Sequence, residues 1–195
     1  MSPSHVAEVR DAKSGAPSAA QSRIITAALD LFARHGVGGT SLQMIADKIG
    51  VTKAAVYHQY KTKDEIVLAA AEAELARLQA VIEAAEAEPP RKRRDALVTG
   101  IVDLAVDRRR TVGTILRDPL IVGFFADHAA FRDVMHRQRR LLTGGEPGPE
   151  GHVRTAMLIA AISGAVTHPF VVDLDDDVLR GQLLRLARRF LGLSP

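Results

Sequence analysis

The dense succession of helix starts and stops between residues 20 and 63 restricts the fold more than any other feature of this 195-residue sequence. Apolar residues at three- and four-residue spacing predict a first amphipathic helix, which Gly36 ends. Thr40, with Gln43 three residues later, predicts a capping box for a second helix, which Gly50 ends after little more than two turns. The apolar residues of the first helix are Ile24, Ile25, Ala28, Leu29, Leu31 and Phe32.

Two further helix starts follow directly. Thr52 is the predicted N-cap of a short third helix from Lys53 to about Tyr60, and Thr62 with Glu65 forms a capping box for a fourth. The paired prolines at 89–90 must end this fourth helix, because proline lacks the N–H donor and clashes with the preceding turn. A helix of about 25 residues spans roughly 38 Å, which is long enough to connect two bodies.

The spacing within residues 42–57 indicates a helix-turn-helix. Such a unit needs a small residue where its helices cross, a turn residue that tolerates positive φ, and apolar residues that fix the second helix on the first. Ala46, Gly50, Val51 and Val56 stand at these places. One face of the third helix then remains free for a major groove. Its residues are Thr52, Lys53, Ala54, Tyr57 and His58.

The distribution of charged residues along the sequence also favours binding of a polyanion at this face of the third helix. Residues 1–63 contain 8 Lys and Arg against 4 Asp and Glu, whereas residues 64–195 contain 18 against 19. The basic excess therefore lies in the first third, although an excess of this size also suits a solvated surface.

The segment from Arg23 to Ala69 resembles the DNA-binding segment of the tetracycline-repressor (TetR) family. The matching stretches are "AALDLFARHG", "TSLQMIADKIGV" and "TKAAVYHQYKTKDEI". The resemblance covers about 47 residues by motif, and the remainder only by length and helical pattern. Ala54 and Ala55 depart from the family pattern, since many relatives carry a glycine there. This departure affects which operator sequence is expected, and it does not affect the expected fold.

The resemblance, together with side-chain chemistry, predicts the contacts with double-stranded operator DNA. Hydroxyl groups and Lys63 suit phosphates, Lys53 suits a guanine edge or a phosphate, and Gln43, Ala54 and His58 are weaker candidates for base readout. The alternative, that these residues are simply polar helix surface, stays open, above all for His58. The complete predicted set is Thr40, Ser41, Gln43, Thr52, Lys53, Ala54, Tyr57, His58, Tyr60, Lys61 and Lys63.

The rest of the chain also has a helical pattern, and no convincing strand appears in it. We therefore predict an all-α fold of about nine helices, with a three-helix DNA-binding head and, as the resemblance implies, a helical regulatory and dimerisation bundle. The predicted divisions are a flexible tail at 1–19, the head at 20–63 and the bundle at 64–195. Within the bundle, residues 152–167 are apolar on nearly every face and are expected to be buried all round.

The resemblance implies a homodimer formed through the last two long helices. A leucine stripe and a face of small residues offer more apolar surface than the core of a monomer needs, although an intramolecular core is the alternative. A two-fold dimer would favour a palindromic operator. The predicted interface residues are Ala160, Gly164, Leu179, Leu183, Leu186 and Phe190.

The resemblance further implies a cavity for a small-molecule inducer. Because aromatic residues are scarce, an aliphatic lining and an apolar or amphipathic inducer are favoured. Each candidate can equally be plain core, and the chain can have lost its inducer. The predicted wall residues are Leu104, Ile115, Leu116, Phe124, Phe125, Phe131, Met135, Met157, Leu158 and Ile162, and the predicted polar anchors are Arg117, His128 and His168.

Several chemistries are not expected. The chain has no cysteine, which excludes disulfides and thiolate metal sites. Asp173, Asp175 and Asp177 resemble the start of a calcium loop, but Val178 occupies the place of the required glycine. The histidines lack metal-ligand spacing, and no catalytic constellation is visible, so no cofactor, no metal and no enzyme activity are predicted. The basic runs at 91–94 and 108–110 are interpreted as solvated surface or helix-end charge.

The sequence also lacks a signal-like N-terminus, and its longest apolar stretch, 157–172, is too short to cross a bilayer. We therefore expect a cytoplasmic protein without a membrane partner. The leading interpretation is a repressor that a small molecule releases from its operator. A ligand-independent DNA-binding protein and an activator stay open as alternatives.

Overall fold

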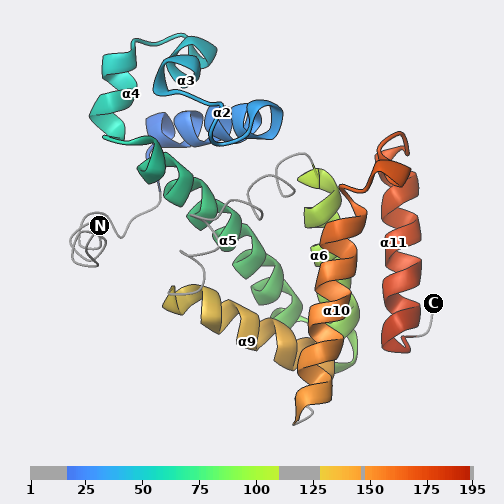
Figure 1. Ribbon diagram of the computed structural model, residues 1–195. Helices are drawn as coiled ribbons and strands as arrows, with labels where there is room; N and C mark the ends of the chain where they lie inside the picture. The colour runs from blue at the N-terminus through green and yellow to red at the C-terminus, as the bar shows by residue number, and fades with distance from the viewer. Residues whose placement is uncertain (1–16, 110–127, 146–147, 194–195) are drawn as a thin grey trace.

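The computed structural model describes residues 17–109, 128–145 and 148–193. In these ranges the chain forms eight α-helices and one short 3-10 helix, and no strand, so the all-α prediction is confirmed (Figure 1). None of these helices is long and apolar enough to span a membrane. The elements are α2 (Ala19–His35), α3 (Leu42–Ile49), α4 (Lys53–Gln59), α5 (Lys63–Ala87), α6 (Pro90–Asp107), α9 (Ala129–Thr143), α10 (Pro149–Ala165), η2 (Pro169–Val171) and α11 (Asp176–Leu191).

Helices α2, α3 and α4 form a head around one hydrophobic core. Phe32 from α2, Ile45 from α3 and Val56 from α4 are almost completely buried in it. The first part of α5 closes this core, because Ile66, Val67, Ala70 and Ala71 also pack there. The predicted division at residue 63 therefore falls at the start of a helix that belongs to both bodies.

The helix ends in the head follow the predicted turn chemistry with two differences. Gly50 is left-handed (φ 71°, ψ 38°) and ends α3, as predicted. Ser18 caps α2, so the helix starts at Ala19, inside the predicted tail. Ser41, and not Thr40, caps α3 by accepting a hydrogen bond from the Met44 N–H at 3.2 Å.

The second body is built on α6, with α5 and α9 packed on it and α10 and α11 completing the bundle. Its core contains Ile82 of α5, Leu97 and Val102 of α6, and Leu142 of α9, all nearly inaccessible. Helices α5 and α6 approach each other very closely, since a Cβ atom placed on Gly100 would lie 2.6 Å from Val81 Cγ1. Glycine is therefore the residue that allows this crossing.

Arginine-carboxylate pairs connect the helices of this body. Arg180 of α11 contacts Asp103 and Asp107 of α6 at 2.7 and 2.9 Å, and Arg188 contacts Asp95 at 2.6 Å. Between α5 and α6, Arg108 meets Glu74 at 2.5 Å. These pairs link α11 and α5 to α6.

Helix α10 differs from its prediction. One side packs into the core through Leu158 and Ile162, but the other side is exposed and remains apolar. Met157, on that side, is 56% exposed. The expectation of burial all round was wrong for the single chain, because the neighbouring helices cover only one side of α10. The exposed residues of this side include Val153, Ala156, Met157, Ala160 and Gly164.

Helix α11 also divides its apolar residues between two sides. Leu179 and Leu183 turn into the core of the chain itself, which corrects their assignment to a dimer interface. Leu186 and Phe190 point outward and are 54% and 45% exposed. The helical period separates the two pairs, although all four belong to one leucine-rich stripe in the sequence.

Candidate nucleic-acid interface

Helix α4 is held by one buried residue and exposes almost everything else. Val56 is completely buried, whereas Lys53, Ala54, Tyr57 and His58 are exposed. The Thr52 hydroxyl accepts the Ala55 N–H at 3.2 Å, which starts the helix at the predicted position. The predicted free face of the third helix therefore exists in the structure.

This face has the shape and the charge of an anion-binding surface. Its residues surround a shallow hollow of about 410 Å³. The Lys61 ammonium lies 4.9 Å from the centroid of the Tyr57 ring, which brings a cation next to a phenol. Phosphate oxygens accept hydrogen bonds from such groups, and the methyl groups of Ala54 and Ala55 suit an apolar contact in a groove. The residues that line the hollow are Lys53, Ala54, Tyr57, His58 and Lys61.

The start of α3 adds polar groups to the head surface. Ser41 and Gln43 are both exposed there, as a DNA contact would require. The Gln43 amide donates to the Asp47 carboxylate at 2.7 Å, so this side chain is held along the helix and not in the predicted capping box. The Glu65 carboxylate likewise accepts the Lys61 N–H at 2.7 Å, while Thr62 caps α5 as predicted.

Three predicted contact residues are engaged within the head, and two of them are buried. Thr40 is buried, and its hydroxyl donates to the Gly36 carbonyl at 2.9 Å, because the end of α2 needs this donor. Tyr60 lies in the head core, where burial and the nearby Glu72 and Glu65 raise the pKa of its phenol. Lys63 donates to the Val37 carbonyl at 2.8 Å. These side chains shape the head and do not lie on its free face.

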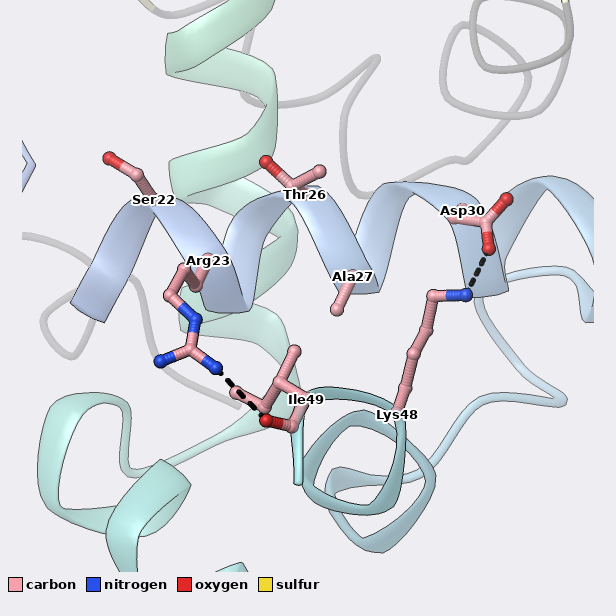
Figure 2. A pocket seen from close by; sticks show the side chains of 7 residues that line it. All are labelled: Ser22, Arg23, Thr26, Ala27, Asp30, Lys48 and Ile49. Carbon is pink, nitrogen blue, oxygen red and sulfur yellow. Dashed lines mark hydrogen bonds and ion pairs between the residues drawn. The ribbon is translucent and has the colours of Figure 1, made fainter. Parts of the chain in front are cut away.

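Contacts across the head fix the turn that aims α4. The Arg23 guanidinium donates to the Ile49 carbonyl at 3.0 Å, and Lys48 forms an ion pair with Asp30 (Figure 2). The hydrogen bond from Lys48 lowers the pKa of the Asp30 carboxyl. Both contacts reach from α2 to the last turn of α3, immediately before Gly50. They border a hollow of about 610 Å³ whose other lining residues are Ser22, Thr26 and Ala27.

Sequence reasoning missed these contacts because their partners are far apart in the chain. Arg23 and Ile49 are 26 positions apart, and neither helical spacing nor a capping motif connects them in the sequence. The apolar spacing of α2 and α3 predicts that the two helices pack, but it does not say which polar side chains meet at the edge of the contact.

The predicted inducer residues that the structure describes differ in their surroundings. Leu158 and Ile162 are core, while Leu104, Phe131 and Met135 are partly buried. Met157 is exposed beside the other outward residues of α10, which corrects its assignment to a cavity wall. His128 stands at the N-cap position of α9. The remaining wall and anchor predictions, Ile115, Leu116, Arg117, Phe124 and Phe125, lie outside the described residues.

His168 has a local structural role. Its ring is exposed, its Nδ1 accepts the Phe170 N–H at 3.2 Å, and the two rings are 4.6 Å apart. It therefore caps the 3-10 turn, and its role as a ligand anchor stays a prediction. Among the residues of the three described ranges, no group of three or more possible metal ligands occurs.

Comparison with known proteins agrees with the geometry of the head. Residues 24–70 match the family of bacterial regulatory proteins called the tetR family. The HTH-type transcriptional regulator SrpR of Pseudomonas putida is 47% identical over 47 residues, which are 24% of this chain and 22% of SrpR. The uncharacterized HTH-type regulator YerO of Bacillus subtilis is 40% identical over 50 residues, 26% of this chain and 17% of YerO. The match thus spans about a fifth of these relatives.

Solved structures show the same fold over nearly the whole chain. A tetR-family regulatory protein from Rhodococcus RHA1 superimposes with a TM-score of 0.71 and 24% identity, covering 92% of this chain and 100% of that one. The fatty acid degradation regulator FadR of Bacillus halodurans gives 0.70 and 17% identity, covering 91% and 97%. Residues 24–70, which contain the helix-turn-helix at α3 and α4, are thus similar to the DNA-binding segment of the tetR family, and the chain has the fold of solved members of that family.

Proposed function

We propose that this regulator binds a palindromic double-stranded operator as a homodimer, with α4 of each subunit in a major groove. The observation that carries the proposal is the exposed face of α4, where two lysines, a tyrosine and a histidine surround a shallow hollow. A helix held by a single buried residue on a rigid support is the arrangement that helix-turn-helix proteins present to DNA.

Within this face the side chains have different proposed roles. Thr52 and Tyr57 donate hydroxyl hydrogen bonds to phosphates, and Lys61 adds a cation beside the Tyr57 ring. Lys53, at the first position of α4, reaches a guanine edge or a phosphate, and His58 reaches a base edge. Ser41 at the start of α3 contacts the DNA backbone, and Gln43 is a weaker candidate for a base edge. Thr40 and Tyr60 are left out of this set because they are buried, and Lys63 because its ammonium donates to the Val37 carbonyl.

The homodimer is proposed from the exposed apolar sides of the last two long helices. Met157 of α10 and Leu186 and Phe190 of α11 are large, apolar and about half exposed. Small residues at Ala160 and Gly164 leave room for close approach, since a Cβ atom on Gly164 would meet nothing within 4 Å. Pairing α10 and α11 with a second copy would remove this surface from water.

Release by a small molecule is the regulatory part of the proposal. Helix α5 contributes to the head core and to the second core, so a change in the second body moves the heads relative to each other. An apolar or amphipathic molecule would act by binding more tightly to the conformation in which the spacing of the two heads does not fit the operator. Repression is the proposed outcome, and a ligand-independent regulator or an activator is the alternative.

The first experiment is the selection of genomic fragments by the purified protein at near-physiological salt. We expect enrichment of a palindromic site by the parent protein and its loss with a Lys53→Ala/Tyr57→Ala variant. Recovery of only nonspecific DNA by both proteins would contradict the operator proposal. A screen of small molecules against the selected operator then separates the inducer-controlled regulator, whose binding some compound weakens, from the ligand-independent one.

Single substitutions test the face itself. Lys53→Ala is expected to weaken operator binding by about 1–3 kcal/mol, or about 5- to 150-fold, in fluorescence anisotropy at fixed salt. Arg77→Ala is the matched control, because Arg77 is an exposed cation on α5 away from the head. Equal affinities of both variants would remove Lys53 from the interface.

A further inference from the structure

A second basic surface lies at the end of the molecule opposite the head (Figure 1). Several helix ends meet there through long-range bonds. The Arg94 guanidinium at the start of α6 donates to the Leu142 carbonyl at the end of α9 at 2.5 Å. Arg188 near the end of α11 pairs with Asp95 at 2.6 Å, and Arg137 of α9 pairs with Glu86 of α5 at 2.6 Å. We call residues 83–95, 137–145, 148–154 and 185–193 the distal basic end.

The distal basic end is as positively charged as the DNA-binding head. Its residues include 11 Lys and Arg against 5 Asp and Glu, whereas residues 20–63 include 6 against 2. The rest of residues 64–195 contains 7 against 14 and is therefore acidic. Residues 64–195 are nearly neutral in total because the positive charge of the distal basic end is balanced by the negative charge of the remaining residues.

Four of the five acids of this end, all except Glu88, form ion pairs, whereas several of its cations do not. Glu83 and Glu86 pair with Arg137, Asp95 pairs with Arg188, and Glu150 pairs with Arg154. Arg140 and Arg93 are close enough to add to the Coulombic lowering of the Glu86 pKa. Within the described residues of the distal basic end, four exposed cations have neither an ion pair nor a side-chain hydrogen bond. They are Arg91, Lys92, Arg140 and Arg189.

We propose that the distal basic end binds the phosphate backbone of a second DNA duplex without reading its sequence. A duplex is a dense line of negative charge, and guanidinium groups match phosphate oxygens in geometry as well as in sign. The choice of DNA as the polyanion rests on the proposed function, which keeps the protein close to DNA.

The proposed dimer strengthens this surface. Both heads must face one operator from the same side, so both distal basic ends lie together on the opposite side of the dimer. Their charges then add across the two-fold axis. An operator-bound dimer would hold a second duplex segment at its far end and bring two DNA segments together.

The experiment uses the full chain and two labelled duplexes, an operator with a donor dye and an unrelated duplex with an acceptor. The distal variant is Arg91→Glu/Lys92→Glu/Arg140→Glu, and the head variant is Lys53→Ala/Tyr57→Ala. We expect the distal variant to keep its operator affinity within about twofold and to lose the energy transfer between the duplexes. The head variant should lose operator affinity but keep salt-dependent binding of the unrelated duplex. This separates failure of the proposal from failure of the operator interface.

Salt dependence gives a quantitative readout. Each phosphate contact contributes about 0.9 to the slope of log affinity against log salt, so the triple variant should lower the slope for the unrelated duplex by up to about 3. Arg140→Glu is compared with Arg77→Glu, which changes the net charge equally but lies outside the distal basic end. Circular dichroism melting shows that each variant is folded, and Arg140→Glu and Lys92→Glu alone replace the triple variant if it does not fold.

Three results would overturn the proposal. Equal losses with Arg140→Glu and Arg77→Glu would show that only total charge matters. Loss of all unrelated-duplex binding in the head variant would show a single DNA surface. Unchanged DNA binding by the distal variant, with loss of binding to polyglutamate, would assign this end to an acidic protein partner instead.

Discussion

Lys61 and Lys63 are two residues apart, yet their ammonium groups have different surroundings. Lys61 is exposed above the Tyr57 ring, while Lys63 is partly buried and donates to the carbonyls of Val37 and Gly38 at 2.8 and 3.5 Å. The first belongs to the proposed DNA face, and the second holds the loop between α2 and α3 against α5.

This difference separates affinity from stability. Lys63→Met should lower the free energy of unfolding by about 1–2 kcal/mol, because it leaves partly buried carbonyls without a charged donor. Lys61→Met should leave stability within about 0.5 kcal/mol and weaken operator binding. Urea denaturation and fluorescence anisotropy measure the two quantities. Equal stability losses in the two variants would contradict the assignment.

Tyr60 predicts a specific alkaline sensitivity. Its pKa in the folded chain is raised above the ordinary value of 10.0, mainly by burial and further by Glu72 and Glu65. The unfolded chain therefore ionises first, and the stability that the neutral phenol contributes is complete below about pH 10 and is lost as the pH rises above it. Between about pH 8 and pH 11, the free energy of unfolding should decrease less in Tyr60→Phe than in the parent protein. An identical decline in both proteins would mean that Tyr60 is not the group concerned.

These residues also mark where sequence reasoning succeeds and fails at this scale. The exposed face of α4 follows from local spacing, since Gly50, Val51 and Val56 fix which side of the helix turns inward. Thr40 and Tyr60 carry polar groups next to that face, and only the packing of α5 and the end of α2 decides that they turn inward.

Among the elements, α5 and α6 approach each other closely at Gly100. Gly100→Ala places a methyl group where Val81 Cγ1 lies only 2.6 Å away, and Val81 is a stiff β-branched residue. Overpacking should cost about 1–3 kcal/mol, which outweighs the gain of about 1 kcal/mol in helix propensity, so the variant should be less stable than the parent protein.

A double-mutant cycle isolates this contact. Val81→Ala combined with Gly100→Ala should cost less than the sum of the two single variants, because the second methyl group enters the space left by the first. Additive losses in chemical denaturation would show that the helices do not meet at these positions.

The same scale explains the error on α10. A helix that is apolar on every side must be buried on every side, but the sequence does not say whether its own chain or another chain covers it. The single chain covers Leu158 and Ile162 and leaves Met157 exposed. For the same reason, the sequence does not predict which apolar residues of α11 lie in the core of the chain and which lie on its surface.

For the whole molecule, the outward residues of α11 decide the proposed assembly. Leu186→Glu/Phe190→Glu should raise the dimer dissociation constant by at least about 30-fold, which corresponds to about 2 kcal/mol, because it buries carboxylates in an apolar interface. Sedimentation measures the assembly. Phe170→Glu is the control, since Phe170 is 90% exposed on the 3-10 turn and not on the paired faces. A dimer that survives the double substitution would place the interface elsewhere.

Three cations that join distant parts of the chain end on main-chain carbonyls: Arg23 on Ile49, Lys63 on Val37, and Arg94 on Leu142. A carbonyl is present whatever side chain the residue carries. Substitution can therefore change the accepting position without breaking the bond, whereas the donating position has no such freedom. Selection acts on one partner of each pair, so these contacts will leave a lone invariant cation in the descendants of this sequence and no pattern of paired substitutions.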